Sequence, residues 1–224
     1  MAVAICQLLF VAIMVQTIAI SEKTTLKYLR DNFNLERATE SSFFPEWQGE
    51  LPALSDTEIQ ALTRIRNRYF HQLDEGMMLE NGVKMMIVSP LLELAGFYDP
   101  PFRARFEPPV NVAVDTGEEV LNGRIDALIV QNQIWVWVLE AKRTTFSLSL
   151  GIPQALTYML ANPERTSPTY GLLCSGESFI VLKLQSQPTA VYGLSNHFNI
   201  LNDGDLGRVL QILRKIGQAA LPST

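Results

Sequence analysis

The chain has 224 residues, of which 47% are hydrophobic and 18% are charged, and this composition is typical of a globular protein rather than a disordered one. Its net charge of -5 argues against a generally basic nucleic-acid-binding protein, but not against a local basic groove, because binding follows the distribution of charge. Two cysteines, Cys6 and Cys174, are too few for a disulfide framework and have no metal-ligand neighbours. We therefore expect a reducing, cytoplasmic environment.

The first twenty residues are apolar almost throughout, and a polar segment follows them abruptly. A signal peptide would need a basic start and a small-residue cleavage site, and neither is clear here. A membrane span needs about twenty apolar residues with basic flanks, whereas Gln7, Gln16 and Thr17 interrupt this segment. Three interpretations stay open: translation starts at Met14, so that residues 1–13 are not translated; the segment is a weak anchor or signal; or it is a buried helix or strand.

The clearest start of a domain lies at Ser55. A short helix around residues 25–32 and a loop rich in aromatic residues over 41–52 precede it. Ser55 is followed three residues later by Glu58, and this spacing is the pattern of a helix capping box. We therefore divide the chain into an N-terminal segment, residues 1–54, and one domain, residues 55–224.

The helix predicted after Ser55 has an apolar stripe and a basic face. Residues at helical spacing predict its buried side: Ile59, Leu62, Ile65, Tyr69 and Leu73. The other side carries Arg64, Arg66, Arg68 and His71. A basic face of this kind could lie along phosphates, but a solvated helix face is the more common arrangement. With His197 as the second of only two histidines, no histidine metal cluster or Ser-His-Asp arrangement can be built.

Residues 80–97 predict a second helix. Pro90 bends or restarts it, with Ser89 as a candidate cap, and Gly96 ends it. Strands are expected near 102–106 and 109–114.

The stretch from Val120 to Arg143 predicts a β-hairpin, because two apolar runs are separated by a polar break at residues 131–133. Asp126 lies inside the first strand, where an aspartate costs stability unless something binds it. Glu140 and Lys142 close the second strand and project to the same side, with Ala141 between them on the other side. Two carboxylates and a lysine at one end of a hairpin suit a hard divalent cation and an oriented water.

A purely structural interpretation of the same residues stays open. Glu140 and Lys142 could form a surface ion pair worth at most about 1 kcal/mol. Asp126 could sit at an edge or bulge and point to water.

Four further elements follow the hairpin. Residues 148–162 predict a helix in which Gln154 and Tyr158, four residues apart, share a face. Residues 170–174 and 179–184 predict a second hairpin, residues 190–200 are ambiguous, and residues 205–219 predict a last amphipathic helix.

Taken in order, these motifs resemble the PD-(D/E)XK nuclease superfamily and, more narrowly, the N-terminal nuclease domain of the restriction (R) subunit of type I restriction enzymes. Glu80 precedes an Ile-x-x-Pro-Leu-Leu run at Ile87–Leu92, and Gly123–Asp126 matches the Gly-x-Asp motif. Glu140–Lys142 matches Glu-Ala-Lys, and Gln154 with Tyr158 matches Gln-x-x-x-Tyr. The Gly-x-Asp match is one residue longer than usual and lacks the usual Pro before Asp. The helicase motor that follows this domain in restriction subunits is absent from the 224 residues.

The resemblance implies an α/β, restriction-endonuclease-like fold, in which a mixed β-sheet is flanked by helices. It implies a Mg²⁺-dependent DNA endonuclease, with Mn²⁺ as a substitute ion. Asp126, Glu140 and the carbonyl of Ala141 would bind the metal, and Glu80 would bind it directly or through water. Lys142 would orient the attacking water and stabilise the transition state, and Gln154 would steady the substrate or the lysine.

Several roles have rivals. Glu75 and Glu93 compete with Glu80 for the helix carboxylate. DNA is the expected partner, and a second copy of the chain is a further candidate. Phosphate contacts are expected from some of Lys84, Arg103, Arg105, Arg124, Arg143 and Arg165.

Two other functions are weighed against the nuclease. One is a catalytically silent protein of the same fold that binds nucleic acid or a partner chain. The other is a membrane-anchored protein of unrelated activity, which depends on the first twenty residues.

Overall fold

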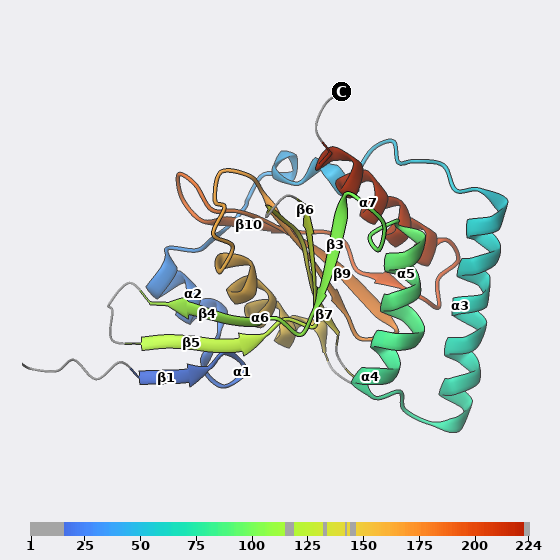
Figure 1. The fold of residues 1–224 in the computed structure, drawn as a ribbon, viewed down its shortest axis with the longest axis horizontal. Helices are drawn as coiled ribbons and strands as arrows, with labels where there is room; N and C mark the ends of the chain where they lie inside the picture. Colours follow the sequence, from blue (N-terminus) through green and yellow to red (C-terminus); the bar gives the residue numbers. More distant parts are fainter. Residues whose placement is uncertain (1–15, 115–118, 132–133, 142, 144–146, 222–224) are drawn as a thin grey trace, which may run out of the picture.

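The computed structural model describes residues 16–114, 119–131, 134–141, 143 and 147–221. Its strands form two sheets (Figure 1). The larger sheet has eight strands in the order β2-β10-β9-β8-β7-β6-β3, with β11 paired to β9. These strands are β2 (Glu36–Arg37), β3 (Phe102–Phe106), β6 (Ala127–Gln131), β7 (Ile134–Ala141), β8 (Thr169–Cys174), β9 (Ser178–Gln185), β10 (Val191–Leu194) and β11 (Phe198–Asn199). The smaller sheet has the order β1-β5-β4, with β1 (Gln16–Ala19), β4 (Pro109–Ala113) and β5 (Glu119–Arg124).

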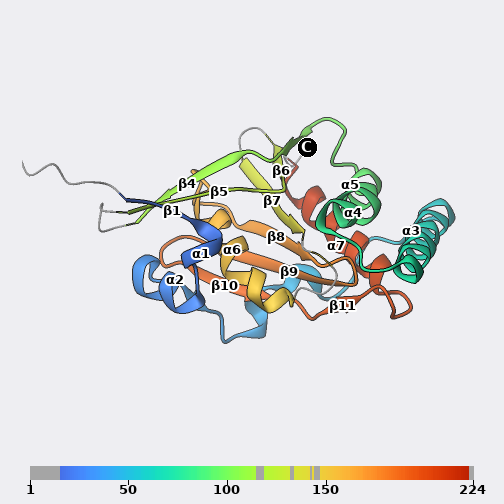
Figure 2. The ribbon, with the colours of Figure 1, turned by 90° about the horizontal axis from the view of Figure 1, so that it is seen from below.

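Helices cover both faces of the larger sheet (Figure 2). On one face lie α3 (Asp56–Glu75), the continuous helix α4 (Glu80–Val83), η3 (Lys84–Val88) and α5 (Ser89–Leu94), and α7 (Asp205–Ala219). On the other face lie α1 (Ile20–Lys23), α2 (Leu26–Phe33), α6 (Leu148–Leu160) and the smaller sheet. Two short helical turns, η1 (Ser41–Phe43) and η2 (Pro45–Trp47), pack beside the first face.

The sheet is mixed, because β7 pairs in parallel with β8 across α6, whereas β6 pairs with β7 in antiparallel. A parallel pair of this kind needs a crossover connection, and α6 provides it. The helix with Glu80, the β6–β7 hairpin, α6 and β8 follow one another in the order that the motifs predict. The expected α/β arrangement, a mixed sheet flanked by helices, is confirmed.

The strand expected over residues 120–130 is broken, and this part of the prediction is wrong. β5 ends at Arg124 in the smaller sheet and β6 begins at Ala127 in the larger one, so Asp126 lies at a bend between strands. The partner strand bends at the same level, where the Glu107 amide donates to the Asp126 carbonyl at 3.2 Å. An aspartate is a poor strand residue, and the chain leaves the strand where it occurs.

The helix expected over residues 80–97 contains a π turn. The amide of Ser89 donates to the carbonyl of Lys84, five residues back, and Pro90 follows immediately. A proline lacks the amide hydrogen and collides with the carbonyl four residues before it, so the preceding turn widens. Pro90 thus follows an irregular turn inside one continuous helix, and Ser89 makes no capping hydrogen bond. Gly96 ends the helix with φ of 80°.

The capping box at Ser55 and the bounds of α6, β8, β9 and α7 agree with the sequence to within two residues. In α3, the expected stripe is buried at Leu62, Ile65 and Tyr69, whereas its ends, Ile59 and Leu73, are exposed. These two ends extend beyond the helices and strands that cover the middle of α3.

The N-terminal region is described from residue 16 onward, and residues 1–15 lie outside the described part of the chain. β1 pairs in parallel with β5, and Ile20 is buried. β2 pairs with β10 in the larger sheet. Within the described residues, none of the helices combines the length and the hydropathy needed to cross a bilayer.

The capping box gives a direct test of local stability. Ser55→Ala removes the side-chain oxygen that accepts the Glu58 amide and is expected to lower the free energy of unfolding by about 1 kcal/mol. Denaturant unfolding measures the loss. Ser147→Ala is the matched control, because Ser147 precedes α6 without a capping hydrogen bond and should cost less. Equal losses at the two positions would contradict the assigned role of Ser55.

Candidate functional site

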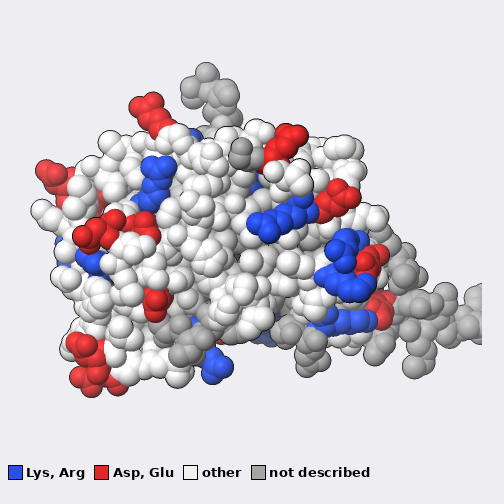
Figure 3. All heavy atoms as spheres, turned by 180° about the vertical axis from the view of Figure 1, so that it is seen from behind, with Lys and Arg blue, Asp and Glu red and all other residues white. Residues whose placement is uncertain are grey.

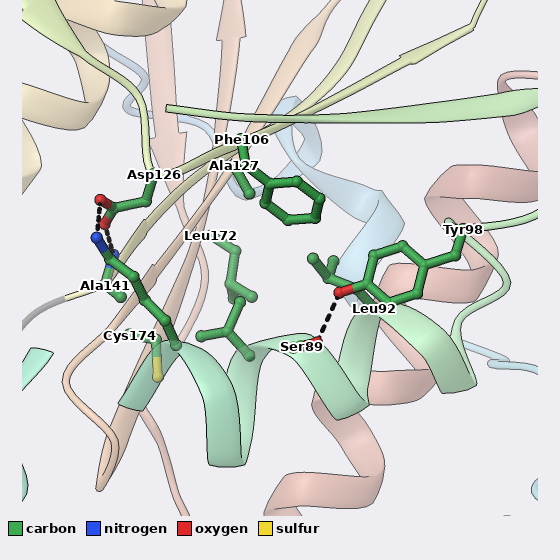
Figure 4. Close-up of a pocket in the computed structure, with 11 residues that line it drawn as sticks. Ser89, Leu92, Tyr98, Phe106, Asp126, Ala127, Ala141, Leu172 and Cys174 are labelled. Carbon is green, nitrogen blue, oxygen red and sulfur yellow. Dashed lines mark hydrogen bonds and ion pairs between the residues drawn. The ribbon is translucent and has the colours of Figure 1, made fainter. Parts of the chain in front are cut away.

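The candidate site is centred on the Asp126 carboxylate, which accepts hydrogen bonds on both oxygens. The Lys84 ammonium lies 2.6 Å from Asp126 Oδ1, and the Ala141 amide donates to Oδ2 at 2.6 Å. Lys84 also lies 3.1 Å from Glu80 Oε1. Figure 4 shows the contacts of Asp126 at one end of a pocket. Two carboxylates from separate parts of the chain are thus held around one cation.

These residues come from three parts of the fold. Glu80 and Lys84 are four residues apart on the α4–η3 helix, so both side chains lie on one helix face. Asp126 sits at the bend before β6, and Ala141 is the last residue of β7, which pairs with β6. The bend turns the aspartate away from regular strand pairing and toward the helix.

The electrostatics of the pair follow from partial burial. The side chain of Asp126 is 14% exposed, and burial raises its pKa even though Lys84 and the Ala141 amide lower it. Partial burial lowers the pKa of Lys84, but its hydrogen bonds and charge interactions with Asp126 and Glu80 outweigh this and raise the pKa above its usual value. The ammonium therefore stays charged between the two carboxylates at neutral pH.

The structure brings part of the predicted site together. Asp126, Glu80 and the backbone of Ala141 meet through the contacts above. The backbone of Glu140 lies in β7 opposite Leu173 of β8, next to Ala141. The Glu140 side chain and all of Lys142 lie outside the described part of the structure, so their roles stay predictions.

Gln154 lies in α6, on the other face of the larger sheet from α4. Its Nε2 donates to the Tyr158 hydroxyl at 2.9 Å, as their shared helix face predicts. Glu75 and Glu93, the two alternatives to Glu80 as the helix carboxylate of the site, are both exposed. It is Glu80 that shares an ammonium with Asp126.

Lys84 is a further residue of the site that the motifs do not predict; from the sequence it is expected only as a candidate phosphate contact. Its spacing from Glu80 was a usable signal, since an acidic residue and a lysine four positions apart on a helix pair with each other. Its contact with Asp126 carried no signal, because the two residues are far apart in sequence. Within the described residues, three or more metal-ligating side chains do not gather at any one point.

The basic residues do not form a continuous surface on the face shown in Figure 3, where they are interspersed with acidic and uncharged side chains. Arg103, Arg105, Arg143 and Arg165 are exposed. Arg124 lies 4.0 Å from Glu107. On α3, Arg66 is used within the chain, where it donates to the carbonyls of Ile200 and Leu201.

A cavity of about 50 Å³ adjoins the ion pair, between the α4–α5 helix and the larger sheet. Its walls are mostly apolar, with the ion pair at one end and the hydroxyls of Ser89 and Tyr98, 2.8 Å apart, at the other (Figure 4). The lining residues are Lys84, Val88, Ser89, Leu92, Tyr98, Phe106, Asp126, Ala127, Ala141, Leu172 and Cys174.

Neither a protein-family model nor a curated protein sequence matches the chain. Among solved structures, the chain is similar to one described as a cryo-EM structure of a DrdV–DNA complex, with a TM-score of 0.46 and 16% sequence identity. The similarity covers 70% of this chain and 96% of that chain. At this level of similarity, the functional assignment rests on the residues of the site.

The partly buried ion pair of Lys84 and Asp126 leads to a pH-dependent prediction. Lys84→Met removes the partner of Asp126, and at pH 7 this should lower the free energy of unfolding by about 2 kcal/mol. Burial already raises the pKa of Asp126, and the loss of the ammonium raises this pKa further. The variant therefore loses folding free energy only while the Asp126 carboxyl is ionised. As the pH falls through that raised pKa, the carboxyl is protonated in the folded state and the cost disappears.

Denaturant unfolding at pH 7 and pH 4 measures the difference between the variant and the wild type. Lys27→Met is the matched control, because Lys27 also pairs with an acidic residue four positions away, Asp31, but on an exposed helix face. A deficit of the Lys84 variant that is equal at both pH values would contradict the assignment.

Proposed function

We propose that this chain is a Mg²⁺-dependent nuclease of restriction-endonuclease-like type that hydrolyses phosphodiester bonds in DNA. The observation that carries the proposal is the meeting of Asp126 and Glu80 around a single cation. Carboxylates from separate elements repel each other, and such a pair is maintained where a positive charge is to be held between them. The motif order that resembles type I restriction subunits supports the same function. The two cysteines suit the reducing cytoplasm in which we place the protein.

The donor set fits Mg²⁺, which prefers oxygen ligands and keeps several waters. Asp126 and Glu80 would hold the ion, with the Glu140 carboxylate and the Ala141 carbonyl as the proposed further ligands, and Mn²⁺ would substitute. The amide of Ala141 already binds Asp126 and holds the end of β7, next to Glu140, beside the aspartate. When bound, the ion lowers the pKa of a coordinated water and neutralises charge on the scissile phosphate.

The remaining roles belong to side chains of the protein. Lys142 orients the attacking water, and its ammonium stabilises the additional negative charge on the phosphate in the transition state. Gln154 steadies the substrate or Lys142 from α6. DNA is the proposed partner, and a second copy of the chain would allow both strands of a duplex to be cut.

A specific observation favours a second candidate, a catalytically silent protein of the same fold that binds nucleic acid or a partner chain. Lys84 already pairs with both carboxylates and balances one of their two negative charges without a metal ion. For Asp126 to bind Mg²⁺ through Oδ1, the Lys84 ammonium must first leave. The two candidates therefore differ in whether a divalent ion displaces Lys84.

Plasmid nicking in the presence of Mg²⁺ or Mn²⁺ tests the nuclease. Asp126→Ala, Glu140→Ala and Lys142→Ala are each expected to lower the rate by at least about a hundredfold, because each removes a charge that the transition state needs. Lys27→Ala, on the surface of α2, is the control that should cut like the wild type. Cleavage that survives the first three substitutions would belong to a contaminant or to a different site.

Metal binding separates the two candidates without any need for turnover. Mn²⁺ should raise the melting temperature of the wild type, since it relieves the repulsion between the carboxylates. Lys84→Met should bind Mn²⁺ about tenfold or more tightly than the wild type, because a competing positive charge is gone. Isothermal titration calorimetry measures both affinities, with Asp126→Ala as the variant that should not bind. If neither the wild type nor the Lys84 variant binds Mn²⁺ through Asp126, the silent candidate replaces the nuclease.

A further inference from the structure

Two aromatic side chains are exposed at the mouth of the cavity that contains Asp126. Among the aromatic residues whose exposure the structure describes, Phe106 and Tyr98 are the exposed ones, at 61% and 39%. Their ring centroids lie 6.2 Å apart at an interplanar angle of 63°, so the rings meet edge to face. Large rings left in water forgo the free energy of burial, and an exposed pair beside a site therefore indicates a ligand surface.

The fold holds both rings in place. Phe106 is the last residue of β3, where it pairs with Ala127, and the amide of the next residue, Glu107, donates to the Asp126 carbonyl. Tyr98 follows the end of α5, and its hydroxyl lies 2.8 Å from Ser89 Oγ. Figure 4 shows Phe106 between Asp126 and Tyr98 along the same pocket. A ring bound at Phe106 would thus lie in the same pocket as Asp126, the carboxylate proposed to hold the metal ion.

The size and lining of the cavity limit what binds there. At about 50 Å³ it takes a few waters or the edge of a ring, but not a whole base, so a planar ligand must lie across the mouth against Phe106. Arg103 and Arg105 alternate with Phe106 along β3 and therefore face the other side of the strand. The surface offered to a ligand is an aromatic one with few hydrogen-bonding groups.

We propose that Phe106 and Tyr98 form a stacking platform for an unpaired nucleobase next to the phosphodiester bond to be cut. This inference rests on the proposed nuclease function and names its substrate class as single-stranded or locally unpaired nucleic acid. Inside a duplex, the faces of a base are covered by its neighbours, so an aromatic side chain stacks on a base that has left the helix. Because every base has a π face, the platform tolerates any base sequence.

Fluorescence anisotropy with a labelled single-stranded oligonucleotide, and with the duplex of the same sequence, tests the platform. Ca²⁺ is present as the cation, and gels confirm that the strands stay intact. The wild type should bind the single strand more tightly than the duplex. Phe106→Leu, which keeps an apolar side chain but removes the ring, should weaken single-strand binding about fivefold or more and leave duplex binding unchanged.

Two matched variants distinguish stacking from general contact. Phe106→Trp retains a ring and should restore single-strand binding, whereas Tyr98→Leu removes the second ring and should weaken single-strand binding while leaving duplex binding unchanged. Leu201→Ala, an exposed apolar position on another part of the surface, should have no effect. Melting curves confirm that each variant is folded.

The outcomes separate this inference from the proposed function. If Phe106→Leu binds the single strand as the wild type does, or if the wild type prefers the duplex, the stacking platform is wrong. The nuclease proposal would still hold in that case if plasmid nicking depends on Asp126. If the wild type neither binds either form of DNA nor nicks a plasmid, both proposals fail together.

Discussion

The structure around the candidate site depends on one partly buried charge, the carboxylate of Asp126. A carboxylate withdrawn from water costs several kcal/mol unless it is paired and hydrogen-bonded, and Asp126 meets this requirement with Lys84 and the Ala141 amide. The two partners come from a helix on one face of the larger sheet and from the end of its central hairpin. The same aspartate marks the bend where the chain passes from the smaller sheet to the larger one. The end of a strand, a contact with the helix and the candidate site therefore meet at one residue.

The π turn in the helix links the two ends of the cavity. Lys84 and Ser89, which it joins by a backbone hydrogen bond, supply the ammonium at one end and the hydroxyl that binds Tyr98 at the other. Pro90 explains why the turn is wide, since no regular hydrogen bond can form from that position. A single irregular turn thus positions both the ammonium that pairs with Asp126 and the hydroxyl that contacts Tyr98.

Lys84 forms ion pairs with two carboxylates, Glu80 and Asp126, and this affects how the site would bind a metal ion. Two carboxylates brought together repel each other, and the single ammonium between them balances one of their two negative charges. In the proposed nuclease, a divalent ion would have to compete with this ammonium for Asp126. The contact that stabilises the carboxylate pair would therefore weaken the proposed binding of the ion.

The sequence by itself determined most of the elements, since apolar periodicity and local signals act between near neighbours. The capping box at Ser55, the helix end at Gly96 and the helix over residues 205–219 belong to this class. Only the tertiary structure decided that residues 120–130 belong to two sheets, because an apolar run looks the same wherever its partner strands lie. It also decided that Lys84 rather than solvent neutralises Asp126, and that Phe106 meets Tyr98. These contacts join residues distant in sequence or on different elements, and packing rather than local propensity brings them together.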